Sequence, residues 1–459
     1  MRYRSIAFLV ANLLAISASY AQGDDGPVPA IGEHLDDSGL EPDGTEIDTA
    51  NPEEPRLFHG LVWGKIDSRL QLQVGSHFMY DYGHIDNNGD LSDAHGDDLS
   101  HGEVRDAVFS FSGQFLLKTR FKLQLEIESG EIDPGDIYVE RDEIPGIGSL
   151  RIGHFVEPFS LERVTSLRHS TFMERSLSSS LAPGKSFGFM VSDTKIDQRL
   201  MWAIGLFRST DTADDAADTD STNVSARLTG LPVFAEGGRR LVHLGMSLQR
   251  GESGDAFRFR PRPESFPAPR YLDTGLLDID SATSLNTEIA GVLGPLSIQG
   301  EYTFSWMENV ESSTLAGGGE DLLFHGGYLQ TSYFLTGEHR TYNHLKGAFG
   351  RTYPSRPFGL REGRRGPGAW EMAARISRID LNDGSLRAGK EANFSLGLNW
   401  YLNESIRTSI NYIRAAIDND VESGNANIVQ ARIQFDFSAK EIGERKPLSR
   451  IRSRFDSES

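Results

Sequence analysis

The sequence predicts an all-β protein, a transmembrane antiparallel β-barrel of about 16 strands. Three observations predict it: long segments in which apolar and polar residues alternate, a secretory signal at the N-terminus, and the lack of any later apolar run long enough for a spanning helix. Such a helix needs about 18 or more apolar residues. Backbone groups in lipid must be paired internally, so a closed barrel is the remaining way for this chain to cross a membrane.

Residues 1–21 have the features of a signal peptide. Arg2 and Arg4 form a charged start, Ile6–Ile16 are mostly apolar, and Ser19–Ala21 make a small-x-small cleavage site. We therefore predict an exported chain from which this segment is removed. The sequence contains no Cys, which excludes disulfides, thiolate metal ligands and cysteine nucleophiles.

An acidic segment, residues 22–57, follows the signal. It holds eleven acidic residues and one cation, Arg56, so it contributes −10 to the formal net charge of −20. It is rich in Gly and Pro and has no periodicity, which predicts a disordered leader. The overall acidity therefore says little about the charge inside the barrel.

Residues 58–437 form the predicted barrel. At about 24 residues per strand and connection, this length gives roughly 16 strands. The clearest alternation lies in residues 115–128, which we expect to form one unbroken strand with Lys118, Arg120 and Lys122 on its wet face. Similar alternation marks residues 70–78, 370–377, 394–401, 406–412 and 429–437. The alternative is a large soluble all-β protein.

The barrel is expected to end on the aromatic pair Phe435 and Phe437. A charged segment, residues 438–459, follows it. We interpret this segment as a solvated tail, with an interaction arm as the alternative.

Several segments in the predicted barrel resemble the phosphate-selective porin O and P family, and they occur in the family's order. These segments are Arg151–Arg163 with Thr165–Ser166 and Thr171–Leu177; Arg262–Ser265 with Ala268–Arg270 and Asp273–Gly275; Gly300–Tyr302; Tyr333–Glu338 with Arg340 and Tyr342; and Gly368–Glu371 with Ala374–Arg375, Asp380–Leu381 and Leu398–Asn403. The resemblance spans about residue 60 to Phe437.

The resemblance implies a 16-stranded, homotrimeric porin in the outer membrane of a Gram-negative bacterium. It also implies a constriction loop that folds inward and narrows the pore, with arginines and lysines that guide oxyanions. The match places this loop in or just after residues 157–185. The tail after Phe437 departs from the family's usual ending.

Three basic sets are candidates for anion binding, because Arg offers a planar fork for two phosphate oxygens and Lys a compact charge. The first is Lys118, Arg120 and Lys122, which could instead pair with acids in a solvated wall. In the second we expect Arg168 and Lys185 to serve transport, and Arg163 and Arg175 to pair with Glu162 and Glu174. The third is a loop that is too rich in Pro for a strand, with Arg258, Arg260, Arg262 and Arg270. We interpret it as a vestibule loop that concentrates anions, with contact to lipopolysaccharide phosphates or to a neighbouring subunit as the alternatives. Arg375, on the polar face of residues 370–377, completes the candidates.

The predicted function is passive, anion-selective uptake of phosphate or polyphosphate through an outer-membrane channel. The alternatives are a weakly selective porin for small solutes and a structural or adhesion barrel. Clustered, unpaired cations in the lumen would favour anions, and cations matched by carboxylates would favour a general channel. Outer-membrane lipid and lipopolysaccharide are expected neighbours, and the export signal argues against nucleic acid. No Gly-x-Ser-x-Gly motif is present, so we predict no enzyme, catalytic residue, metal site or cofactor.

Overall fold

The computed structural model describes residues 61–63, 70–116, 118–128, 131–209, 221–252, 256–312, 319–359, 366–419 and 422–437. All of them belong to one compact unit, Arg56–Ser459. The predicted signal peptide (1–21), the acidic leader (22–57) and the tail (438–459) lie outside the described residues, so these three predictions stay predictions.

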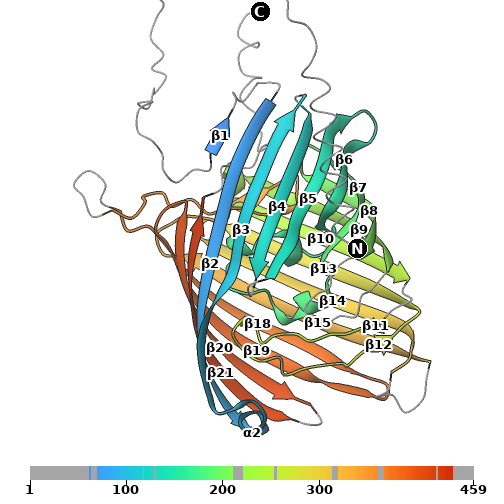
Figure 1. Cartoon of the computed structure of the whole chain (residues 1–459). Helices are drawn as coiled ribbons and strands as arrows, with labels where there is room; N and C mark the ends of the chain where they lie inside the picture. The colour runs from blue at the N-terminus through green and yellow to red at the C-terminus, as the bar shows by residue number, and fades with distance from the viewer. Residues whose placement is uncertain are drawn as a thin grey trace, which may run out of the picture. The chain divides into compact units, whose positions relative to one another are not determined.

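Sixteen strands in the described part of the chain form a closed antiparallel barrel, as predicted (Figure 1). Each strand pairs with the next, and β21 pairs with β2 from His77–Asp436 to Gly89–Gly424 to close the ring. The short strand β1 (Leu61–Trp63) pairs with β2 beyond the end of β21. The barrel strands are β2 Leu70–Gly89, β3 Asp98–Phe115, β4 Thr119–Glu128, β5 Glu131–Ile144, β6 Gly148–Val156, β7 Lys185–Lys195, β8 Leu200–Ser209, β9 Thr222–Ala235, β10 Arg240–Glu252, β13 Ser281–Leu293, β14 Leu296–Val310, β15 Glu320–Phe334, β18 Ala369–Asp383, β19 Leu386–Tyr401, β20 Ile406–Asp418 and β21 Ser423–Asp436.

The alternation of residue types puts apolar side chains outside and polar ones inside. On β19, Phe394 and Leu396 are 44% and 45% exposed, whereas Ser395 and Asn399 are fully buried. This distribution is the reverse of that in a soluble protein, where large apolar side chains are mostly buried. It is the distribution required when lipid surrounds the wall.

The predicted unbroken strand over residues 115–128 is wrong. Phe115 ends β3, Leu116 and Lys118 are turn residues, and β4 begins at Thr119. The turn carries no Gly or Pro because Leu116 itself adopts a positive φ of 51°, a conformation that non-Gly residues seldom take. Because the polar–apolar alternation continues across this turn, the residue pattern did not indicate that the strand ends there.

The two ends of the barrel differ in the length of their connections. We call the end that holds the junctions after β3, β5, β7, β9, β13, β15 and β19 the turn end, because most of these junctions are short. Its one long connection is residues 335–368, which contains β16 (Tyr342–Asn343) and β17 (Ala348–Phe349). The opposite end, with α2 (Asp90–His95), is the loop end.

Two long connections from the loop end lie inside the barrel. The first inward loop, residues 157–184, contains α3 (Leu161–Val164), η1 (Leu167–His169) and η2 (Leu177–Leu181). The second, residues 256–276, contains only the two-residue strand β11 (Ala256–Phe257), which pairs with β12 (Leu277–Asp278). Both loops pack in one apolar core against inward-facing side chains of strands on the far wall: Leu177, Leu181, Tyr271 and Leu272 with Phe324, Ile379, Ile413 and Ile428.

None of the helices in the described ranges has the length and apolar character needed to span a bilayer.

Candidate functional site

A band of alternating charges, which we call the ladder, lines the inner face of β4–β7. Arg120, Lys122 and Lys185 are 22–25% exposed, and each contacts a carboxylate. The distances are 2.8 Å from Arg120 to Asp142, 2.8 Å from Lys122 to Asp136, and 2.5 Å from Lys185 to Glu126. The remaining pair is Arg151–Glu140, at 2.9 Å. Every cation of the ladder is therefore matched by an acid.

Lys118 does not belong to this ladder. It lies in the turn after β3, where its ammonium is 2.8 Å from Glu143, and its side chain is 44% exposed. Because Lys118 is outside β4, the alternation of that strand does not determine which way its side chain points, and its predicted place in the lumen stays a prediction.

Arg375 faces inward from β18, but the two inward loops cover it. Its guanidinium is 2.7 Å from Glu264 of the second inward loop and 3.4 Å from Glu162 of the first. It also lies over the Phe172 ring, with 4.3 Å to the ring centre. Only 1% of its side chain is exposed, so a solute in the lumen cannot reach it.

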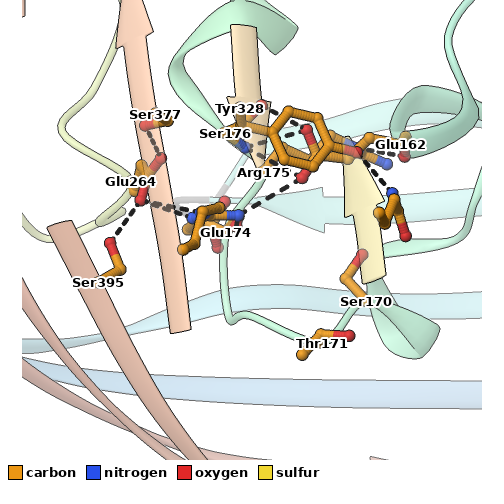
Figure 2. Close-up of polar contacts among 12 residues, drawn as sticks. Glu162, Ser170, Thr171, Glu174, Arg175, Ser176, Glu264, Tyr328, Ser377 and Ser395 are labelled. Atoms are coloured by element: carbon orange, nitrogen blue, oxygen red, sulfur yellow. Dashed lines mark hydrogen bonds and ion pairs between the residues drawn. The ribbon is translucent and has the colours of Figure 1, made fainter. Parts of the chain in front are cut away.

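The carboxylate of Glu264 attaches the second inward loop to the wall. In Figure 2 it lies between Ser377 of β18 and Ser395 of β19, and it accepts a hydrogen bond from each. Together with the bond to Arg375, these contacts satisfy an anion that is fully buried.

The first inward loop is fastened to the far wall through its backbone. The Glu301 carboxylate of β14 accepts from the backbone N–H groups of Leu161 and Glu162, at 2.8 and 2.7 Å. Arg407 of β20 donates to the carbonyls of Ser170 and Thr171, at 2.7 and 2.9 Å. Since the loop leaves β6 and returns to β7, these contacts carry it across the inside of the barrel.

Arg168 lies toward the turn end. It shares the Asp436 carboxylate with Arg351, at 3.1 and 2.6 Å, and with Arg407 it lines a cavity of about 20 Å³. Such a volume holds about one water molecule. The cavity is too small for a phosphate.

The four arginines of the third basic set bind the second inward loop to itself. Arg258 and Arg260 contact Asp273. Arg262 donates to the carbonyls of Phe266 and Ala268, and Arg270 donates to that of Arg260. The loop is not a strand over most of its length, as predicted, but the arginines hold it folded inside the barrel, which the vestibule interpretation did not foresee.

Arg163 and Arg175 of the first inward loop do not form the expected ion pairs. Glu162 contacts Arg375, and Glu174 contacts Arg105 of β3 and Arg432 of β21. Arg163 donates instead to the Pro183 carbonyl at 2.9 Å, and Arg175 to the Glu162 and Thr165 carbonyls at 3.3 and 3.4 Å. Within the described residues, neither arginine has a carboxylate in ion-pair range. Adjacency in sequence suggested the wrong pairs because neighbouring side chains of an irregular loop point to different elements.

Both arginines are half-buried. Burial, followed by the nearby charge of Arg163, lowers the pKa of Arg175 to about 10, so its guanidinium is protonated at neutral pH. Three guanidinium nitrogens donate no hydrogen bond within the described part of the chain, and none of them is buried: Nη1 and Nη2 of Arg163 and Nη1 of Arg175. The two residues therefore offer donor nitrogens that have no carboxylate in ion-pair range among the described residues, on a loop inside the barrel.

Comparisons with known proteins were consistent with these features. The sequence model of a family described as phosphate-selective porin O and P matches residues 72–437. The chain is 26% identical over 409 residues to Porin O of Pseudomonas aeruginosa. The match covers 78% of this chain and 86% of that protein. It is also 26% identical over 404 residues to an uncharacterized protein of Caulobacter vibrioides, covering 83% and 76%. Among solved structures, OmpT of Vibrio cholerae matches with a TM-score of 0.49, at 11% identity over 82% of this chain and 100% of that one.

Proposed function

The chain belongs to the phosphate-selective porin O and P family, and on this premise we propose that phosphate or polyphosphate crosses the outer membrane through it passively. Membership in this family makes the chain a channel of the Gram-negative outer membrane and not an enzyme, as the sequence predicted. The substrate and the anion selectivity are the proposed part.

The observation that carries the proposal is the pair Arg163 and Arg175 on the first inward loop. Moving an oxyanion requires donors that replace part of its water without holding it permanently. The two guanidiniums have free donors and no carboxylate partner among the described residues. Because the loop crosses the inside of the barrel, we place the constriction at this loop and the anion between the arginine pair and the ladder.

The ladder favours a second candidate function, a weakly selective porin for small solutes. Its four cations are matched by Glu126, Asp136, Glu140 and Asp142. A wall of this kind is close to neutral and attracts cations and anions about equally. The arginine pair and the ladder therefore make opposite predictions for selectivity.

We further propose that the barrel is a homotrimer among outer-membrane lipid and lipopolysaccharide. Barrels of this class have short periplasmic turns and longer extracellular loops. On this basis the turn end faces the periplasm and the loop end faces outward.

The test is the reversal potential of the refolded full-length protein in a planar bilayer under a salt gradient. Phosphate is then titrated against the chloride current. We expect anion preference and block by phosphate, and both should weaken at least about tenfold in Arg163→Gln/Arg175→Gln, since two charge-assisted contacts are lost. Lys118→Gln, in the exposed turn, is the matched control.

Two results would overturn the proposal. One is cation preference of the unmodified protein, and the other is unchanged phosphate block in the double variant. A conducting channel without preference would support the weakly selective porin.

A further inference from the structure

Three exposed cations lie together on the outer wall near the loop end. They are Arg378 on β18, Lys390 on β19 and Arg414 on β20, three adjacent strands (Figure 1). Arg378 is 63% and Lys390 41% exposed, and Arg414 is exposed as well. Cations on the outside of a barrel are costly at the middle of the membrane and become acceptable near its surface.

The strand register brings these cations around one small residue. Ala392 of β19 lies directly opposite Arg378, two positions from Lys390, and next to Ala416, which is two positions from Arg414. Direct neighbours across strands are about 5 Å apart and diagonal ones about 7–8 Å. The three long side chains therefore surround a small area of the outer wall that is formed by two exposed alanine methyl groups, those of Ala392 and Ala416.

The position of the cluster along the strands matches the boundary between hydrocarbon and headgroups. Ile376, Phe394 and Tyr412 are outward-facing and lie next to the cluster on the side of the membrane centre. Tyr302 of β14 is in the same row as Arg378, joined to it through Gly327 of β15. Aromatic residues gather where lipid headgroups begin.

Two carboxylates face the cluster and set its net charge. Asp380 contacts Arg378 at 3.4 Å and Lys390 at 3.5 Å through the same oxygen, which keeps the two cationic nitrogens within about 7 Å of each other. Asp418 is exposed and opposite Lys390 in the register. Three cations and two acids leave one positive charge. Asp380 therefore preorganises two donors at a spacing that a phosphate group can bridge.

We propose that this outer-wall cluster, Arg378, Lys390 and Arg414, binds the phosphorylated headgroup of a glycolipid in the outer leaflet, the lipid A part of lipopolysaccharide. Phosphate suits the site because it accepts charge-assisted hydrogen bonds from Arg and Lys together. The acyl chains of the same lipid would lie along the apolar outer wall of the barrel. The proposal rests on the proposed orientation, in which the loop end faces outward.

The test measures binding of fluorescent diphosphorylated lipid A to the detergent-solubilised, refolded full-length protein. In Arg378→Gln/Lys390→Gln/Arg414→Gln we expect the Kd to rise roughly ten- to a hundredfold, because each basic residue near a lipid surface contributes to anionic lipid binding. Asp418→Asn should lower the Kd, because it removes a carboxylate from the cluster. Arg240→Gln, whose exposed cation lies at the turn end, should leave it unchanged.

The inference is overturned if the triple variant binds the lipid like the unmodified protein, or if dephosphorylated lipid binds equally well. Folding is verified by the heat-dependent shift in electrophoretic mobility. Conductance and anion preference of the triple variant are expected to be unchanged, since none of its residues faces the lumen. The lipid site and the proposed transport function can thus fail independently.

Discussion

The two walls of this barrel carry similar inward charges and use them differently. On β4–β7 the ladder cations are 18–25% exposed. Elsewhere on the inner face Arg227 of β9, Arg375 of β18 and Arg432 of β21 are only 1–3% exposed, because each lies against a connecting segment and donates to its backbone carbonyls. A side chain that points into a barrel is therefore not always in contact with the solution inside it. The loops decide which wall a solute meets.

The two walls should also differ in how much their ion pairs contribute to the stability of the protein. Exposed pairs in water contribute little to stability, whereas removing one member of a buried pair leaves an uncompensated charge. We therefore expect substitutions on the covered wall to change stability, and substitutions on the ladder to change ion preference. The following predictions test this separation, from the largest effect to the smallest.

Arg375→Met should destabilise the protein by about 3–5 kcal/mol, because Glu264 and Glu162 are left buried without their cation. The measurement is the free energy of unfolding in urea after refolding into lipid bilayers. Arg378→Met, an exposed position on the same strand, is the control. If Arg375→Met lowers the free energy of unfolding by less than about 1 kcal/mol, the covered wall is as accessible to water as the ladder.

Glu174 should make the attachment of the first inward loop sensitive to acid. Burial acts to raise the pKa of Glu174, but Arg105 and Arg432 outweigh it and lower the pKa to about 2 from an ordinary value of 4.5. Because the folded pKa is the lower one, its stabilisation is fully present above about pH 4.5 and is lost as the pH falls toward 2.

The comparison of Glu174→Gln with the unmodified protein tests this effect. The variant should be less stable by about 3–4 kcal/mol at pH 7, the free energy that corresponds to the pKa shift. The difference should shrink at pH 3. An equal difference at both pH values would mean that the ionised carboxylate is not what holds the loop.

Glu126→Gln should shift ion preference toward anions by a factor of about two, since it releases Lys185 from a partly exposed pair of modest strength. Lys122→Gln, on the same strand, should shift it the opposite way by leaving Asp136 unmatched. Reversal potentials in a salt gradient report both shifts. If the two variants shift in the same direction, the ladder is not the wall that the ions meet.

Lys118→Ala should have the smallest effect, within about 0.5 kcal/mol of stability and without change in ion preference. Its pair with Glu143 is more than 40% exposed on both sides, at the turn end. A clear change in reversal potential would place this turn in the ion path and contradict its position outside the ladder.

The sequence by itself determined the class of the protein, its approximate strand number and the direction of its side chains. Phe394, Leu396 and Leu398 alternate with Ser395 and Asn399, and a period of two is read directly from such a pattern. The family resemblance was equally readable, and residues 72–437 confirm it. These features depend only on neighbours along the chain.

Only the tertiary structure decided which inward charges are accessible and which are paired. Arg375 and Arg120 have the same alternating context in sequence, but loops from distant parts of the chain cover one and not the other. In the same way, Glu162 and Glu174 bind arginines from β3, β18 and β21 and not their neighbours Arg163 and Arg175. Ion pairing depends on distances between segments far apart along the chain, and local periodicity contains no information about those distances.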